Sequence, residues 1–395
     1  MTKSLVMARH FKKAGFFVLG VTSPKYRYVM SRFSKAFEKV YVIPDARTQP
    51  EDYIKSLVQI LKKYKVEWFI PICAPATELV DGRARDYLVK NKICKVLHFD
   101  EKTTLKLGNK FEFSKWAESL GLNVPEYTKI TDPQQVIDYK ISRGKRYVLK
   151  RIKYDPTRRG VPILLPMSAE LDTENFLTSL NISTDNPWIL QQFIEGREYC
   201  AHATVVDHKI KLYTDSKSSA TQLNYQHVGQ PLIYKWVEEF IKKSKLSTGQ
   251  LCFDFIEDSD GNVFPIECNP RVHSAITSFY NQSDVIEACF GDFNSNRLPL
   301  IPTLSSRMTY WLPEEISRLF KLLINSDVFR NIKKMERGLI NMLKGKYIIF
   351  STDDPWPALG VHLHFISLLI PKIINGSRWT RLEFCIGKIV ELEGD

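Results

Sequence analysis

The feature that most constrains this chain is a pair of apolar stretches on either side of an Asp-Gly-Asn turn at residues 260–262. An Asp-Gly turn between two apolar runs predicts a β-hairpin. Antiparallel neighbours in that hairpin can place Asp254 beside Glu267. Residues i and i+2 of a strand share a face, so Asn269 can lie on the same side as Glu267. The fold must therefore accommodate two carboxylates and an amide at one place.

Carboxylates at this spacing indicate a cation, because two like charges side by side repel unless a cation lies between them. Mg²⁺ prefers oxygen ligands and usually completes its octahedron with waters and nucleotide phosphates. Asp254, Glu267 and Asn269 are thus candidate magnesium ligands. Arg271 can instead clamp a phosphoryl group or an anionic intermediate. Two simpler alternatives stay open: an acidic strand end before a turn at Pro270, and a salt bridge from Arg271 to one of these acids.

Charge and length narrow the class of protein. The 395 residues, 44% of them hydrophobic, are enough for two or three domains with a large core. A net charge of +12 favours an anionic ligand, nucleic acid or an acidic membrane surface. The basic residues are spread along the whole chain, which favours an anion-handling enzyme over a dedicated nucleic-acid binder.

Cysteine usage and apolar runs predict a cytoplasmic protein. There are seven cysteines, an odd number, and none forms a CxxC pair, so we expect reduced core thiols. No apolar leader is apparent at the N-terminus. The most apolar late segment, residues 359–370, is closed by Pro371 and falls short of the roughly 20 residues of a membrane span. We expect no integral membrane segment; peripheral membrane contact and the oligomeric state stay open.

Periodicity divides the chain into three expected domains, at residues 1–100, 101–292 and 293–395. Helix–strand alternation in the first predicts a parallel α/β unit; the expected elements are helices over 2–14 and 51–65 and strands over 16–21, 37–43 and 68–72. The second domain mixes strands and helices in an α+β manner. Its expected helices are 103–120 and 232–245, and its expected strands are 147–152, 188–194 and 250–257. The third is basic and mainly helical, with two amphipathic helices over 313–345 and a short strand over 384–392.

Further polar residues could handle a nucleotide. Lys150 lies in mid-strand, where its charge could be aimed at phosphate oxygens, although a strand lysine usually points to solvent. The run from Gln191 through Phe193, followed by Glu198, indicates a strand edge whose backbone N–H and C=O groups could hold adenine. Any edge strand offers the same backbone groups.

The ordered set of Lys110, Lys150, residues 191–198, Asp254 and residues 267–271 resembles the ATP-grasp superfamily. More specifically, several segments look like the ATP-grasp ligases that make mycosporine-glycine, and the likeness spans nearly the whole chain; these segments are 150–155, 187–194, 218–220, 224–225, 269–277 and 384–392. The resemblance implies an ATP-grasp fold of α/β and α+β parts, with an N-terminal Rossmann-like pre-ATP-grasp domain and a helical C-terminal extension.

The resemblance also implies roles for individual residues. Lys110 and Lys150 would contact ATP phosphates, while Gln191 and the backbone near Phe193 would hold adenine and Glu198 the ribose. Mg²⁺ would be bound by the hairpin residues already named, with Arg271 stabilising transition-state charge. Candidates for the substrate pocket are His273, Ser274, Thr277 and Arg158, the last with Arg159 in a loop that closes over the phosphates. The implied reaction joins 4-deoxygadusol to glycine with cleavage of ATP.

Two departures from that family stand out. The hinge position often held by Glu is Gln191 here, so an uncharged amide must accept the adenine amino group. Family members also carry upstream sequence, with a first strand and sometimes an apolar anchor, whereas this chain opens in a helix. We therefore expect Met1 to lie inside the family's first domain.

Two other functions remain open from the residues. The first is a carboxylate–amine ligase that acts on an amino acid or peptide through an acyl phosphate, because the nucleotide machinery would be the same. The second is a non-enzymatic basic protein that binds nucleic acid or anionic lipid. Paired carboxylates count against nucleic acid, since they would weaken phosphate binding, and we expect no nucleic-acid partner.

Overall fold

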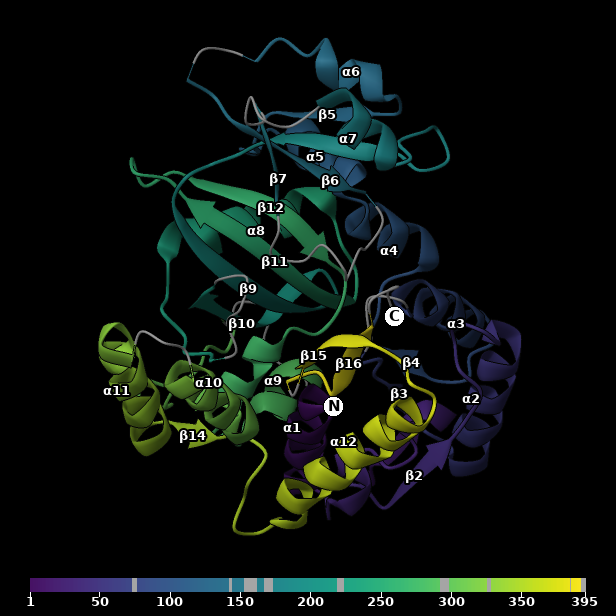
Figure 1. Cartoon of the computed structure of the whole chain (residues 1–395). Coiled ribbons are helices and arrows are strands. Elements are labelled where there is room, and N and C mark those ends of the chain that lie inside the picture. Colours follow the sequence, from purple (N-terminus) through teal and green to yellow (C-terminus); the bar gives the residue numbers. More distant parts are fainter. Residues whose placement is uncertain are drawn as a thin grey trace.

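Two four-stranded antiparallel sheets lie above a group of N-terminal and C-terminal elements in a computed structural model of the chain (Figure 1). The structure describes residues 1–72, 77–141, 144–152, 162–166, 173–218, 224–291, 298–324, 328–383 and 385–391. Segments far apart in the sequence meet in the lower part, where the purple start of the chain lies beside its yellow end.

The upper sheet has the strand order β5-β8-β6-β7. Its strands are β5 (Tyr127–Ile130), β6 (Tyr147–Arg151), β7 (Ile163–Leu165) and β8 (Trp188–Gln192). Two short helices pack on this sheet, α6 (Pro133–Ile137) and α7 (Thr173–Ser179). Its central strand β8 is apolar along most of its length, and Trp188, Ile189 and Leu190 are fully buried. The expected strands over 147–152 and 188–194 are confirmed.

The middle sheet has the order β10-β9-β11-β12. Its strands are β9 (Arg197–Val206), β10 (Lys209–Lys217), β11 (Gly249–Glu257) and β12 (Val263–Asn269). Helix α8 (Pro231–Ser244) covers the sheet with an aromatic core in which Trp236 and Phe240 pack against Phe253. Pro231 suits the first turn of α8, and the Gln230 side chain accepts the Leu232 N–H as its cap.

The hairpin predicted from the sequence is confirmed. β11 and β12 are antiparallel neighbours, and Asp254 is paired directly with Glu267. The turn contains Gly261 at φ +83°, a conformation that most other residues avoid. The register shifts immediately after Asp254, which is a local irregularity that the sequence did not indicate.

One expected helix is in fact two. The stretch predicted as a helix over 103–120 forms α4 (Glu101–Gly108) and α5 (Lys110–Ser119). The break lies at Asn109, whose Oδ1 accepts the N–H groups of Phe111 and Glu112 and so caps α5. This cap makes Lys110 the first residue of α5.

The N-terminal part alternates helices and strands as predicted, but it does not form one parallel sheet. Its elements are α1 (Thr2–Lys13), β1 (Leu19–Thr22), η1 (Pro24–Tyr26), η2 (Met30–Phe33), β2 (Lys39–Val42), α2 (Pro50–Tyr64), β3 (Trp68–Phe69), α3 (Glu78–Lys90) and β4 (Lys95–Val96). β1 pairs with β2 and β3 with β4, both in parallel, and within the described residues these pairs are separate sheets. The large cavity described below reaches both pairs and is lined there by β1, β3, α1 and α2.

The C-terminal part packs against the first helix of the chain. It contains η3 (Ser274–Phe279), α9 (Val285–Phe290), β13 (Thr309–Tyr310), α10 (Leu312–Ile324), α11 (Val328–Lys344), β14 (Lys346–Tyr347), α12 (Trp356–Ile374), β15 (Trp379–Glu383) and β16 (Lys388–Glu391). Thr2 bridges to it, accepting from Trp311 Nε1 at 2.8 Å and donating to the Cys385 carbonyl at 3.1 Å. Arg9 pairs with buried Asp354 at 3.0 Å. One core cluster thus joins both ends of the chain, while the three expected domain boundaries stay predictions.

Helix α12 differs from the expectation drawn from its sequence. Pro371 does not end it, and the helix continues to Ile374 for 19 residues. By length and composition it is the one helix in the described part of the chain that is apolar enough to cross a membrane, and 33% of its most apolar window is buried inside the protein. Its length alone does not distinguish a span from a core or surface helix.

Candidate active site

A cavity of about 2500 Å³ runs from the upper sheet past the middle sheet to the N-terminal elements. Most of the residues predicted to handle a nucleotide line it. These are Lys110, Lys150, Gln191, Phe193, Glu198, Asp254, Glu267, Asn269 and Arg271. They come from α5, from two strands of the upper sheet, and from three strands of the middle sheet with the turns beside them.

Lys150 points inward from β6 rather than to solvent. Its Nζ donates to Gln191 Oε1 at 3.0 Å on the neighbouring strand β8. Burial lowers the pKa of Lys150 from 10.5 to about 8, although Glu267, Asp254 and Glu198 act in the opposite direction. A buried ammonium that is only partly compensated by its neighbours is well suited to meet an anion.

Glu267 is the centre of the charge cluster. Its Oε2 lies 3.6 Å from Lys110 Nζ, and its Oε1 accepts from Asn269 Nδ2 at 3.1 Å. Burial alone would raise the pKa of this carboxyl, but Lys110, the Asp254 side chain and Lys150 together hold the pKa at about 2. Glu267 is therefore ionised at neutral pH, which a metal ligand requires.

Arg271 is fixed by a partner that the sequence analysis missed. Its Nη1 lies 3.0 Å from Glu78 Oε2 and donates to Asn269 Oδ1 at 2.7 Å. Glu78 is the first residue of α3, 193 positions earlier in the chain. Burial raises the pKa of Glu78, with Glu267 acting in the same direction and Arg271 and Lys110 opposing it. The salt bridge expected as the alternative for Arg271 exists, but to Glu78 rather than to the hairpin acids.

The donor set fits a magnesium ion. Within the described residues no three or more His, Cys, Asp and Glu side chains group as a metal site by themselves. The hairpin offers two carboxylates, and Asn269 Oδ1, which accepts from Arg271 here, would join them by turning toward the ion. Oxygens of this kind are the partial set that Mg²⁺ takes in proteins when waters and phosphates supply the rest. Lys110, whose Nζ lies 3.6 Å from Glu267, and Lys150 line the same cavity and could carry those phosphates.

In the segment expected to hold adenine, polar groups of Gln191 and Phe193 already have hydrogen-bond partners within the protein. Gln191 is only 1% exposed, and its side chain bonds to Lys150 and to the Ile266 carbonyl. The Phe193 N–H donates to the Arg146 carbonyl at 2.8 Å. Adenine would therefore have to use other backbone groups of this segment, so its recognition by Gln191 and Phe193 stays a prediction. Glu198 lines the cavity and is exposed on β9.

The predicted substrate residues separate into three groups. His273 and Ser274 line the cavity, with His273 capping η3 and Ser274 Oγ 3.2 Å from Cys385 Sγ. Thr277 does not reach the cavity: it is fully buried, donates to the Ser274 carbonyl, and lies 2.9 Å from the Thr309 hydroxyl. Arg158 lies outside the described residues.

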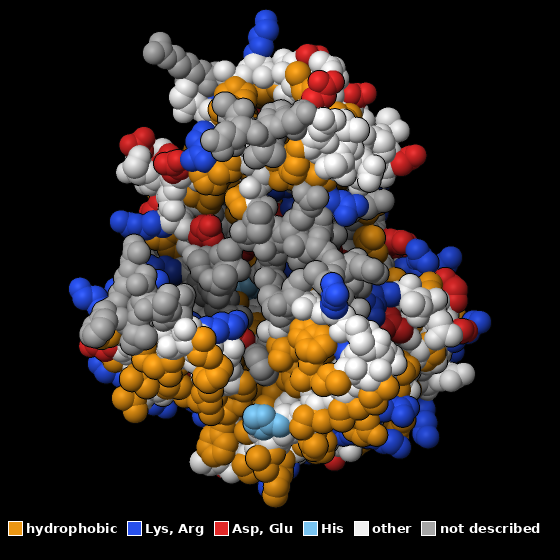
Figure 2. Space-filling model, in the orientation of Figure 1, with side chains coloured by type: hydrophobic (Ala, Val, Ile, Leu, Met, Phe, Trp, Pro, Cys, Tyr) orange, Lys and Arg blue, Asp and Glu red, His pale blue; other side chains and the backbone are white. Residues whose placement is uncertain are grey.

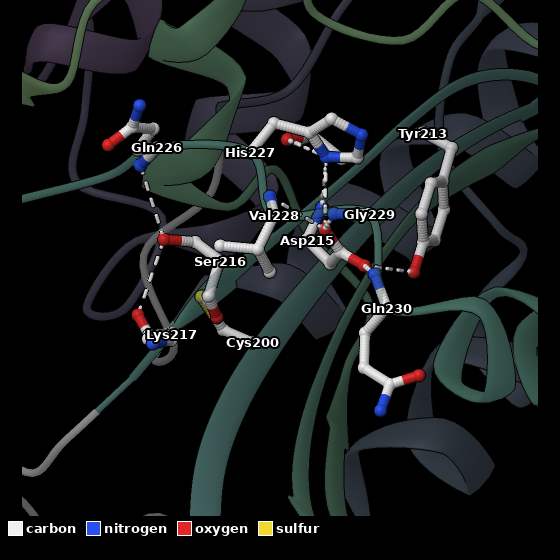
Figure 3. Close-up of polar contacts among 11 residues, drawn as sticks. Cys200, Tyr213, Asp215, Ser216, Lys217, Gln226, His227, Val228, Gly229 and Gln230 are labelled. Carbon is white, nitrogen blue, oxygen red and sulfur yellow. Dashed lines mark hydrogen bonds and ion pairs between the residues drawn. The ribbon is translucent and has the colours of Figure 1, made fainter.

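A second polar cluster, also absent from the sequence analysis, holds the cavity wall (Figure 3). Asp215 is fully buried at the end of β10 and accepts the N–H groups of Gly229 and Gln230, each at 2.7 Å. His227 Nδ1 lies 2.9 Å from the same carboxylate. Burial would raise the pKa of Asp215, but His227 and the backbone N–H groups hold the pKa below 3.8. The carboxylate thus fixes the loop before α8, whose residue Val228 lines the cavity.

The arrangement of helices and strands in this chain is similar to that in several solved structures. The chain is similar to an L-amino acid ligase from Bacillus licheniformis, with 15% identity, a TM-score of 0.52, and coverage of 70% of this chain and 67% of that one. It is similar to biotin carboxylase from Campylobacter jejuni, with 13% identity, a TM-score of 0.56 and coverage of 76% and 70%. It is also similar to N5-carboxyaminoimidazole synthetase from Staphylococcus aureus, with 12% identity, a TM-score of 0.56 and coverage of 78% of both chains.

The chain has the ATP-grasp fold. No protein-family model and no curated protein matches the sequence. At these identities the structural likeness establishes the fold, and the chemistry must be argued from the residues in the cavity.

Proposed function

We propose that this ATP-grasp protein is an ATP- and Mg²⁺-dependent, ADP-forming ligase that phosphorylates an oxygen of a small organic acid and joins that acid to an amine. The observation that carries the proposal is the cluster formed by Lys110, Lys150, Asp254 and Glu267, where α5, β6 and the β11–β12 hairpin meet at one cavity. Alternating positive and negative groups of this kind match the charges of a magnesium–phosphate complex.

Each side chain has a defined task in this proposal. Lys110 and Lys150 hold phosphate oxygens, and the hairpin carboxylates with Asn269 hold Mg²⁺, which supplies charge neutralisation when bound. Arg271 is held between Asn269 and Glu78, and it stabilises the negative charge that develops during phosphoryl transfer. The acceptor oxygen bonds to the γ-phosphorus as ADP leaves; the amine nitrogen then adds to the activated carbon, and phosphate departs with the electron pair of the C–O bond.

We infer that the acceptor is 4-deoxygadusol and the amine glycine, giving mycosporine-glycine. The support is the sequence resemblance over residues 269–277, of which His273 and Ser274 line the cavity. A second candidate is a carboxylate–amine ligase that acts on amino acids through an acyl phosphate, favoured by the likeness of fold to an L-amino acid ligase. A cytoplasmic location is consistent with the six cysteines in the described residues, all of which are free.

The test is an assay of the purified chain with ATP, Mg²⁺, 4-deoxygadusol and a panel of amino acids. ADP release and the ultraviolet absorbance of the product are followed together. Turnover with 4-deoxygadusol and glycine supports the specific proposal. Turnover only with pairs of amino acids supports the second candidate, and a lack of ADP release with every pair refutes the ligase assignment.

A further inference from the structure

Helix α12 is apolar on two opposite sides, and only one side is covered by protein. The covered side holds Val361, Phe365 and Leu368, all buried. It packs closely on η2, since a Cβ added at Gly360 would lie 2.5 Å from the Phe33 ring. The helix is therefore anchored on this side to η1 and η2 of the N-terminal part of the fold.

The other side of α12 is exposed and carries almost only large apolar side chains. Their spacing of three and four residues places them along one stripe of the helix; with their exposed fractions they are Trp356 56%, Leu359 61%, Leu363 51%, Ile366 48%, Ile370 50%, Ile373 64% and Ile374 76%. A surface helix of a water-soluble protein normally carries polar residues on that side.

The hairpin of α10 and α11 exposes a second apolar stripe. On α10 it comprises Ile316, Phe320, Leu323 and Ile324, at 53–69% exposure. On α11 it comprises Ile332, Leu339, Ile340 and Leu343, the last 82% exposed. Figure 2 shows hydrophobic side chains gathered over α10–α11 and over α12 along the lower part of the same face of the molecule.

Exposed basic residues lie on the α10–α11 hairpin itself, at Lys321, Lys333, Lys334 and Lys344. Others lie on the elements that pack against the covered side of α12. Its neighbours η1 and η2 and their flanks expose Lys25, Arg27, Arg32 and Lys35, and Arg378 follows the helix. Segment 24–35 contains no acidic residue, and the exposed acid nearest the helix start in sequence is Asp353. Trp356 and Trp379, both partly exposed, stand near the two ends of the stripe, as aromatic residues do at a membrane interface.

We propose that the exposed sides of α12 and of the α10–α11 hairpin form a docking surface for a lipid bilayer with anionic headgroups. The apolar stripes enter the headgroup–acyl boundary while the exposed lysines of the α10–α11 hairpin and Arg378 meet lipid phosphates and carboxylates. Because one side of α12 is packed on the protein, the helix lies in the plane of the membrane instead of crossing it. This docking requires no nucleotide and is independent of the ligase proposal.

The experiment is flotation of the full chain with phosphatidylcholine vesicles that contain or lack phosphatidylserine. We expect binding to the anionic vesicles, weaker binding to the neutral ones, and weakening by salt. Ile366→Glu with Ile370→Glu should reduce binding about tenfold or more. The matched control is Leu232→Glu with Val89→Glu, two exposed apolar residues on α8 and α3 (46% and 43% exposed), which should bind as the unmodified chain does.

Two further measurements keep the proposal falsifiable. Lipids brominated in their acyl chains should quench fluorescence in the unmodified chain more than in Trp356→Phe, which tests insertion even if the double glutamate variant fails to fold. Failure to float with anionic vesicles, or equal binding by the stripe and control variants, would overturn the proposal. So would a dimer in lipid-free solution, seen by light scattering, that the stripe variant abolishes, because the face would then bind a second copy.

Discussion

We expect the buried charge of Lys150 to lower the free energy of unfolding of the chain at neutral pH. Its ammonium is buried beside Glu267 and Asp254, yet burial outweighs their attraction and lowers the pKa from 10.5 to about 8. At neutral pH the folded chain must therefore keep a charged group that it disfavours. The depression corresponds to about 3 kcal/mol of destabilisation at pH 7.

Replacing Lys150 with Met removes this cost but introduces another. Gln191 Oε1 then loses the donor at 3.0 Å, which costs on the order of 1–3 kcal/mol for a buried acceptor. The net change at pH 7 is thus small, and its pH dependence is the informative quantity. The unfolded chain binds more protons than the folded one between about pH 8 and 10.5, so the lysine penalty disappears as pH rises through that window.

The assay is urea unfolding of the unmodified chain and of Lys150→Met at pH 7 and at pH 10.5. Between pH 7 and pH 10.5, we expect the free energy of unfolding of the unmodified chain to rise by about 3 kcal/mol relative to that of Lys150→Met. Lys140→Met, at an exposed lysine between α6 and β6, should show no such shift. A difference that is constant with pH would refute the reasoning about Lys150. Nucleotide binding by Lys150→Met should fall at least tenfold, because a charge-assisted contact to phosphate is lost.

Three other substitutions test the site, with Cys268→Ala as a control for the first. Glu267→Gln should abolish turnover while keeping the fold, with a lowered melting temperature because Lys110 and Lys150 lose an anionic partner. Cys268→Ala on the opposite face of the strand should keep turnover; an active Glu267→Gln enzyme would contradict the metal assignment. Arg271→Ala should reduce kcat by about 10²–10³, and an unchanged kcat would remove Arg271 from the mechanism. Asp215→Asn should destabilise the fold by about 2–3 kcal/mol at pH 7, because the Gly229 and Gln230 N–H groups lose a charged acceptor. The pKa of Asp215 is lowered, so this difference in urea unfolding should start to diminish below about pH 4 and be lost as pH falls through the lowered pKa; a difference that stays constant in acid would show that the charge is not its source.

Local sequence was sufficient for the hairpin and for most helices and strands. Alternation and turn chemistry depend on neighbours within a few residues, so the pairing of Asp254 with Glu267 could be read from the Asp-Gly turn and the strand lengths. The same locality explains two errors. Asn109 is a helix cap that divides a continuous apolar pattern, and Pro371 is accommodated inside α12 although prolines usually end helices.

The sequence by itself determined the charge set of the cavity: two lysines, two carboxylates, an amide and an arginine in an order that predicted the ATP-grasp fold. Only the tertiary structure decided what holds that set in place. Glu78 reaches Arg271 across 193 positions, and Asp215 fixes a loop through backbone groups that have no sequence signature. Tertiary packing also decided that Thr277 lies away from the cavity and that one apolar side of α12 stays uncovered. Such contacts depend on which surfaces meet, and periodicity along the chain specifies the surfaces without specifying their partners.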